Sequence, residues 1–67
     1  MRKEKRKPMY KLMYERKKAG FTQIQLSKKV GGNDGLIYAY EAGSRIPNAE
    51  MLVKIANALN CKVDDIL

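Results

Sequence analysis

The sequence predicts an all-α protein, a compact bundle of five short helices. Three observations predict this class: apolar residues recur at helical spacing, cap residues and glycines separate the helical segments, and no segment alternates like a β-strand. With 67 residues, the chain has room for one small domain. We expect this domain to span residues 9–67, after a basic segment at residues 1–8.

The first helix is predicted over about residues 9–19. Pro8 is tolerated at the first turn of a helix because its missing N–H needs no partner there. Three apolar residues form one stripe at i, i+3 and i+4, namely Met9, Leu12 and Met13. Gly20 supplies the left-handed residue that commonly ends a helix.

The second helix is predicted over about residues 23–30. Thr22 and Gln25 have the Thr-x-x-Gln spacing of a capping box, in which each side chain bonds the backbone N–H of the other residue. Leu26 and Val30 lie one turn apart and form the apolar side of this helix.

The third helix is predicted over about residues 34–42, with Asn33 or Asp34 as its cap. Its apolar face consists of Leu36, Ile37 and Tyr40. Gly43 ends the segment. Gly35 disfavours a helix interior by roughly 1 kcal/mol relative to Ala, so the start of this helix is the least sharply defined boundary.

The fourth helix is predicted between Asn48, which can cap it, and Asn60, which can close it. Its apolar residues sit at i, i+3, i+4 and i+7, namely Leu52, Ile55, Ala56 and Leu59. A fifth helix is predicted as one last turn over residues 63–67, with Ile66 and Leu67 pointing into the core.

The second and third helices are joined by only about three residues, Gly31-Gly32-Asn33, and must therefore cross steeply. Ser27 is small enough to let the two helices approach, so residues 23–42 fit a helix-turn-helix. The corner leaves the outer face of the third helix free, and this face carries Asn33, Asp34, Tyr38, Ala39 and Ala42. A protruding helix fits the major groove of B-DNA, which is about 12 Å wide.

The net charge of +7 is unevenly distributed. Residues 1–29 carry eleven Lys or Arg against two acids, and residues 30–67 carry three against five. This imbalance predicts a polyanionic partner, either nucleic acid or a membrane surface. We expect residues 1–8 to be a disordered basic arm, either a solvated tail or an arm that lies along phosphates or enters a minor groove.

The composition argues against several classes of function. Cys61 is the single cysteine and histidine is absent, so we expect no disulfide within the chain, no zinc or other metal site, no cofactor and no catalytic site. No apolar run approaches the roughly 20 residues that span a bilayer, and no secretory signal is visible. We therefore expect a reduced, cytoplasmic protein that is neither an enzyme nor a membrane protein.

Three stretches of the chain match a known pattern. They are Arg16-x-x-x-Gly20-Phe21-Thr22-Gln23-x-x-Leu26-Ser27-x-x-Val30-Gly31, Ile37-x-x-Tyr40-Glu41-x-Gly43-x-Arg45-x-Pro47 and Leu52-x-x-Ile55-Ala56-x-x-Leu59. Together they resemble the Cro/phage-repressor-type helix-turn-helix, also called the xenobiotic-response-element family, over residues 9–67. The resemblance implies a lambda-repressor-like bundle and a sequence-specific transcriptional regulator that binds double-stranded DNA, by default a repressor. It also implies a homodimer, whose contacts we expect around the fourth helix, the fifth helix or the loop between them.

The resemblance further implies the roles of individual residues. The positions that match the family's DNA-binding residues are Thr22, Gln23, Asn33, Asp34, Tyr38, Ala39, Ser44 and Arg45. The first two would lie near phosphates, with Gln23 also bracing the third helix, the middle four would face the bases, and the last two would meet the phosphate backbone. Arg16 and Glu41 match a pair that joins the first and third helices; independently, a charge on an apolar stripe needs a partner.

Two departures from the family pattern bear on specificity. Gly32 stands where a branched apolar residue is usual, and Asp34, Gly35 and Ala39 stand where Gln, Ser or Arg are common. The third helix thus has few long donors, and shape and backbone contacts would supply more of the affinity. An alternative function is a protein-interaction or antitoxin-type module on the same fold. A third, a basic membrane-binding peptide, is disfavoured because the apolar stripes match one another and are separated by caps.

Overall fold

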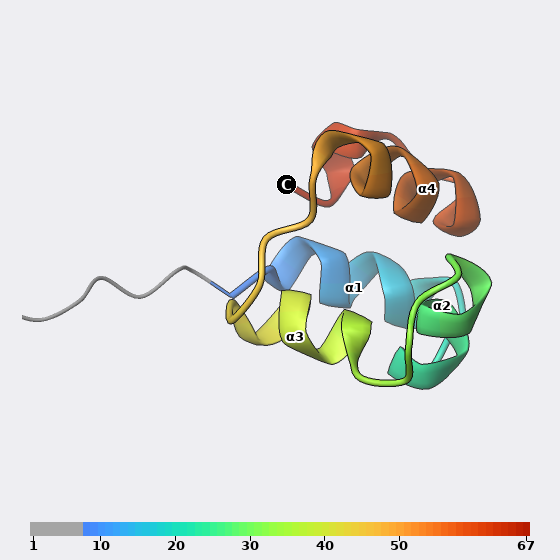
Figure 1. Ribbon diagram of the computed structural model, residues 1–67. Helices are drawn as coiled ribbons and strands as arrows, with labels where there is room; N and C mark the ends of the chain where they lie inside the picture. The colour runs from blue at the N-terminus through green and yellow to red at the C-terminus, as the bar shows by residue number, and fades with distance from the viewer. Residues whose placement is uncertain (1–7) are drawn as a thin grey trace, which may run out of the picture.

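The computed structural model describes residues 8–67, which form an all-helical bundle (Figure 1). Its elements are α1 (Tyr10–Lys18), α2 (Gln23–Lys29), α3 (Leu36–Ala42), α4 (Ala49–Leu59) and a 3-10 turn, η1 (Val63–Asp65). The predicted all-α class is confirmed, but the prediction of five helices is wrong, since the described residues contain four α-helices. The basic arm predicted for residues 1–8 lies, except for Pro8, outside the described residues.

The segment predicted as a fifth helix forms a 3-10 turn because its first backbone bonds join residues three apart. The Asp65 N–H donates to Lys62 O at 2.9 Å, and the Ile66 N–H donates to Val63 O at 3.0 Å. An Asp65 carboxylate oxygen also accepts the Lys62 N–H at 2.9 Å, which favours the tight turn. Ile66 is fully buried whereas Leu67 is exposed, so only one of the two predicted core residues points inward.

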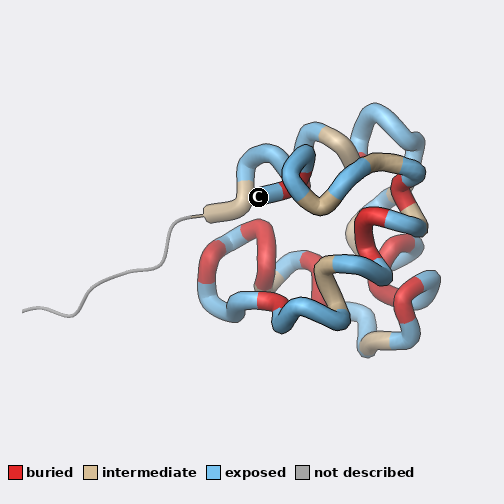
Figure 2. Tube along the Cα trace, turned by 90° about the horizontal axis from the view of Figure 1, so that it is seen from above, coloured by how far each residue is buried: buried red, intermediate tan, exposed pale blue. Residues whose placement is uncertain are grey.

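α1 is the central element of the bundle. In Figure 1 it lies between α4 above it and α3 below it, and α2 closes one end of the molecule. α1 contacts α3 and η1, while α2 contacts both α3 and α4. Buried apolar residues from the four α-helices and the segments that follow α2 and η1 form one core (Figure 2), namely Leu12, Leu26, Val30, Leu36, Ile37, Tyr40, Ile55, Ala56, Leu59 and Ile66.

The helices of residues 8–67 are all short. The longest, α4, has 11 residues, whereas a helix that spans a bilayer needs about 20 apolar residues. None of the described helices therefore has the length and apolar character to cross a membrane.

The predicted caps of α2 and α4 are present. The Gln25 N–H donates to Thr22 Oγ1 at 3.0 Å and the Thr22 N–H donates to Gln25 Oε1 at 2.9 Å, which completes the capping box. At the start of α4, the Met51 N–H donates to Asn48 Oδ1 at 2.8 Å. Asn60 closes α4 in the left-handed conformation, with φ 57°. These contacts satisfy backbone groups that helix ends leave unpaired.

α3 begins two residues later than predicted. Asn33 Oδ1 accepts the Gly35 N–H at 3.2 Å, and the Asn33 carbonyl accepts the Leu36 N–H at 3.1 Å. Residues 33–36 therefore form a turn, and Gly35, rather than Asn33 or Asp34, is the N-cap of α3. Asn side chains favour such turns and helix caps for the same reason, because their oxygen reaches a nearby backbone N–H.

Candidate nucleic-acid interface

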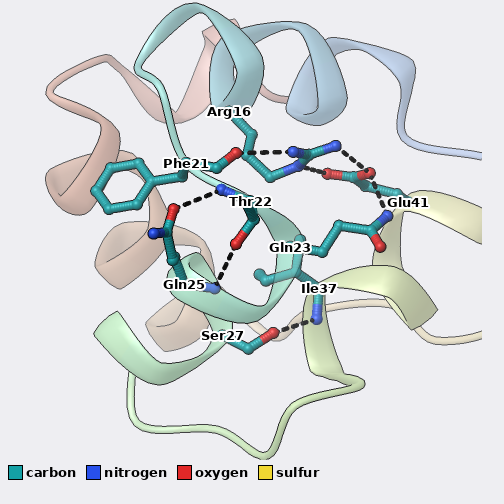
Figure 3. Close-up of polar contacts among 8 residues, drawn as sticks. All are labelled: Arg16, Phe21, Thr22, Gln23, Gln25, Ser27, Ile37 and Glu41. Carbon is teal, nitrogen blue, oxygen red and sulfur yellow. Dashed lines mark hydrogen bonds and ion pairs between the residues drawn. The ribbon is translucent and has the colours of Figure 1, made fainter.

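The corner between α2 and α3 is held by a buried hydroxyl. Ser27 of α2 is fully buried, and its Oγ accepts the Ile37 N–H of α3 at 3.0 Å (Figure 3). This N–H belongs to the first turn of α3, whose N–H groups have no partner within the helix. From the sequence we used Ser27 only for its small size and missed this bond. A serine on the apolar side of a helix is the signal that could have revealed it.

Gly32, in the connection between α2 and α3, has no room for a side chain. A Cβ there would lie 2.2 Å from Leu36 Cδ2 and 3.1 Å from Leu36 Cβ. Leu36 is itself buried, so the space beside the turn is already filled from α3. The preceding Gly31 has φ +82°, a left-handed conformation that a side chain would strain. Gly32 therefore suits this turn because the Leu36 side chain occupies the space that a side chain at residue 32 would need.

Three polar side chains from three helices meet beside α3. The Arg16 guanidinium of α1 donates twice to the Glu41 carboxylate of α3, from Nε to Oε2 at 2.5 Å and from Nη2 to Oε1 at 3.1 Å (Figure 3). Gln23, the first residue of α2, donates from Nε2 to Glu41 Oε1 at 2.9 Å. The predicted ion pair is confirmed, and Gln23 contacts α3 as its predicted bracing role requires. Its contact with a phosphate stays a prediction.

Burial gives this network a structural role. Arg16 and Glu41 are only 7% and 2% exposed, and a buried charge is costly unless it is paired and hydrogen-bonded. Arg16 Nη1 also donates to the Phe21 carbonyl at 2.8 Å, which ties the connection between α1 and α2 to the same point. The N-terminus of α2 is therefore held beside the C-terminal part of α3.

The C-terminal end of α3 is closed by the Ala39 carbonyl, which accepts several donors, among them the Gly43 N–H. Ala39 O accepts the Ser44 N–H at 3.0 Å, the Arg45 N–H at 3.2 Å and the Ser44 hydroxyl at 3.2 Å. Gly43 takes the left-handed conformation, φ 84°, that commonly accompanies such a closure. The backbone of residues 43–45 is consequently held against the helix end.

Arg45 is exposed at this closed end, and its guanidinium lies over the ring of Tyr40, 5.8 Å from the ring centroid. At this distance a guanidinium is attracted electrostatically to the aromatic face. From the sequence we predicted Tyr40 only as a core residue, which it also is. The contact was missed because nothing in the residue order indicates that Arg45 turns back toward α3.

The structure places the eight predicted DNA-binding residues on α3, just before it, and at two neighbouring helix ends. Six of them are exposed, namely Thr22, Asn33, Asp34, Tyr38, Ser44 and Arg45. Gln23 and Ala39 are half-buried. Tyr38 is 60% exposed and shares the outer face of α3 with the exposed Ala42. This face is uncovered, as a helix-turn-helix that docks on DNA requires.

Acidic and thiol groups do not gather into a metal site in the described part of the chain. Among residues 8–67, no three His, Cys, Asp or Glu side chains lie together as ligands would. Burial, helped by the nearby carboxylates of Glu15 and Asp65, raises the pKa of the Cys61 thiol. The thiol therefore stays protonated at neutral pH, a form that neither attacks electrophiles nor binds metals well.

The helix-turn-helix family matches residues 12–66, and the chain belongs to this family. Among curated proteins it is similar to the cryptic phage CTXphi transcriptional repressor RstR of Vibrio cholerae, with 36% identity over 56 residues. The match covers 84% of this chain and 50% of RstR, so the chain spans half the length of that relative.

Two solved structures have a similar fold. The P22 c2 repressor protein, in complex with a synthetic operator, is 32% identical with a TM-score of 0.80, over 91% of this chain and 94% of that chain. The restriction-modification controller protein C.AhdI of Aeromonas hydrophila has a TM-score of 0.78 at 23% identity, over 85% of this chain and 83% of that chain. At this low identity the second likeness shows the fold alone.

Proposed function

We propose that the protein is a DNA-binding transcriptional regulator, specifically a repressor, that reads the major groove of double-stranded DNA with α3. The observation that carries the proposal is the uncovered outer face of α3, which is held near both ends. Ser27 bonds the start of the helix, and Gln23 and Arg16 bond Glu41 near its end. A helix held in this way loses little conformational entropy when it binds. Similarity to two repressors supports the proposal.

The proposed contacts divide between bases and phosphates. Base edges would be met by Tyr38 and Ala39 of α3 and, in the turn before this helix, by Asn33 and Asp34. Phosphates would be met at the start of α2 and the end of α3, by Thr22, Gln23, Ser44 and Arg45. In this arrangement Asp34 could accept a hydrogen bond from a cytosine amino group.

The mechanism we propose is equilibrium binding in the cytoplasm, without a catalytic step or a cofactor. The basic residues concentrated in residues 1–29 would neutralise phosphates and release their counterions. If about six phosphates are neutralised, the logarithm of the binding constant falls with the logarithm of salt concentration at a slope near −5. Repression would follow from occlusion of a promoter by the bound protein.

We further propose a homodimer that joins through the loop after α3 and the C-terminal side of the bundle. An apolar groove of about 250 Å³ lies there, lined by Pro8, Met9, Arg45, Ile46, Pro47, Leu52 and Leu67. Ile46 and Leu67 are 66% and 62% exposed, so a second copy that covered them would remove apolar surface from water. Two-fold symmetry would place two α3 helices roughly 34 Å apart, in successive turns of the major groove.

Selection of bound sites from random duplex DNA with purified protein tests the proposed function. We expect enrichment of a near-palindromic motif. Tyr38→Ala should change which sites are enriched because this side chain would face the bases, whereas Arg45→Ala should weaken all sites alike. If no motif is enriched, the protein is not a sequence-specific regulator, although its fold is unaffected.

A protein-interaction or antitoxin-type module is the second candidate, and the composition of α3 favours it. Tyr38 is the single long polar side chain exposed on α3, and the remaining exposed or half-buried positions of the helix are Ala39 and Ala42. Titration with random duplex DNA at low salt separates the two candidates. A protein that only binds other proteins gives no salt-sensitive affinity for DNA.

A further inference from the structure

A groove between α2 and α4 brings together two lysines that are far apart in the sequence. Lys29 of α2 and Lys54 of α4 line it, together with Val30, Gly31, Asn57 and Ala58. Its volume is about 540 Å³, within the roughly 300–1,000 Å³ of sites that hold small ligands. In Figure 1, α4 and α3 lie on opposite sides of α1, and the groove includes none of the eight predicted DNA-binding residues.

The two lysines leave an uncompensated positive charge at this groove. Within residues 8–67, the ammonium groups of Lys29 and Lys54 take part in no ion pair and no hydrogen bond. Lys18, by contrast, lies 3.7 Å from a carboxylate oxygen of Glu15. Two like charges that face one concave surface repel each other and attract an anionic occupant.

The remaining lining suits a short peptide better than a long polyanion. The Asn57 amide can pair with a peptide group, and the half-buried Ala58 adds a small apolar contact, whereas Val30 is buried beneath the groove. A duplex that ran along α4 would also meet the exposed carboxylate of Glu50, which lies one helical turn before Lys54 on the same face of this helix. A short segment with two carboxylates can engage the lysines and avoid this repulsion.

We propose that this groove binds an acidic segment of a protein partner. Its carboxylates pair with Lys29 and Lys54, and a small apolar side chain between them packs on the half-buried Ala58. Because the groove is separate from the outer face of α3, a partner docked here leaves that face open. The inference does not depend on DNA binding and goes beyond it: the same domain carries a second, protein-directed surface.

Nuclear magnetic resonance titration of the isotope-labelled protein tests the proposal. The probe is a set of capped hexapeptides in which Asp and Glu flank Val or Ala, and the control probe replaces the acids by Asn and Gln. We expect the amide signals of Gly31, Lys54 and Asn57 to shift with the acidic peptides only. The amide signals of Ile37 and Tyr38, on α3, should not shift.

Three single substitutions separate the groove from general electrostatic attraction. Lys29→Gln and Lys54→Gln should each weaken peptide binding by about two- to fivefold, the range expected when an exposed ion pair is lost. Lys28→Gln is the matched control, because it removes the same charge from a neighbouring exposed position outside the groove. Circular dichroism melting curves verify that all three variants fold.

Several outcomes would overturn the proposal. An equal loss of peptide binding in Lys28→Gln would show that the peptide responds to the net charge of the protein and not to this groove. Inorganic phosphate at matched ionic strength that shifts the same amides equally would make the groove a general anion site. Duplex DNA that shifts them would assign the groove to nucleic acid. If no amide signal shifts at millimolar peptide, the groove does not bind acidic segments.

Discussion

The guanidinium of Arg45 lies over the buried ring of Tyr40, 5.8 Å from its centroid, at the C-terminal end of α3. The ring is fixed because Tyr40 belongs to the hydrophobic core, and the backbone of Arg45 is held by its bond to Ala39 O. An exposed cation is thus oriented by the interior of the protein. Such preorganisation lowers the entropy lost when the side chain binds a phosphate.

Arg45→Lys should weaken binding to all DNA sequences by about threefold, because a lysine is not held in a planar stack on Tyr40 and loses more side-chain entropy on binding, about 0.5–1.5 kcal/mol per immobilised side chain. The salt slope should stay unchanged, since the charge is retained. Fluorescence anisotropy across a salt series measures both quantities. Arg45→Ala is the matched comparison and should also reduce the slope by about 1. Unchanged affinity in Arg45→Lys would contradict the stacking role, because charge alone would then account for the contact.

Arg16→Ala should lower the free energy of unfolding by about 3–5 kcal/mol, because Glu41 would remain buried without its cation. Urea denaturation followed by circular dichroism measures the loss. Lys18→Ala is the control: the Lys18 side chain is exposed, and its 3.7 Å pair with the half-buried Glu15 should contribute less than about 1 kcal/mol. Equal losses in the two variants would mean that burial does not make the Arg16 pair important.

Ser27→Ala should lower the free energy of unfolding by about 1–3 kcal/mol, because the buried Ile37 N–H would lose its acceptor. Hydrogen exchange at the Ile37 amide should accelerate more than exchange in α4, since the α2–α3 corner is loosened locally. Native-state exchange measured by nuclear magnetic resonance resolves the two effects. If the Ile37 amide accelerates no more than the amides of α4, Ser27 does not hold the corner.

Gly32→Ala should destabilise the fold by about 1–3 kcal/mol through overpacking, because its Cβ would meet Leu36 Cδ2 at 2.2 Å. Gly31→Ala should lower the free energy of unfolding by about 1–2 kcal/mol for another reason. Its Cβ would have no neighbour within 4 Å, but the left-handed backbone at residue 31 would be strained by a side chain. Double-mutant cycles with Leu36→Ala distinguish the two. The cycle should show coupling for Gly32 and additivity for Gly31, and the reverse would refute the packing explanation.

The local signals predicted most of the helical architecture correctly. α2 and α4 begin after Thr22 and Asn48, as expected, because a cap depends on residues within a single turn. α3 was predicted two residues too early, since the Asn33 oxygen serves a turn instead of a cap. The prediction of a fifth helix was wrong for a similar reason. Hydrogen bonds between residues three apart satisfy the backbone of this segment, so it forms a 3-10 turn and not an α-helix.

The candidate site could be predicted in outline. The contact between α2 and α3 was expected, although their connection spans residues 30–35 and not only the three residues predicted. The exposure of Tyr38 follows from the apolar pattern on the other side of α3. The partner of Arg16 could also be anticipated, because a charge on an apolar stripe requires one. Contact between the eight predicted residues and DNA stays a prediction.

The amino-acid order by itself determined the helices, most of their ends and the concentration of positive charge in residues 1–29, because these depend on spacing within one or two turns. Only the tertiary structure decided that Ser27 bonds Ile37, that Arg45 stacks on Tyr40, and that Lys29 and Lys54 share a groove. The groove lies between α2 and α4 and the corner lies between α2 and α3, and the relative orientation of these helices depends on how the whole core packs. The Arg45 contact depends on how the chain leaves α3 and turns back over that core.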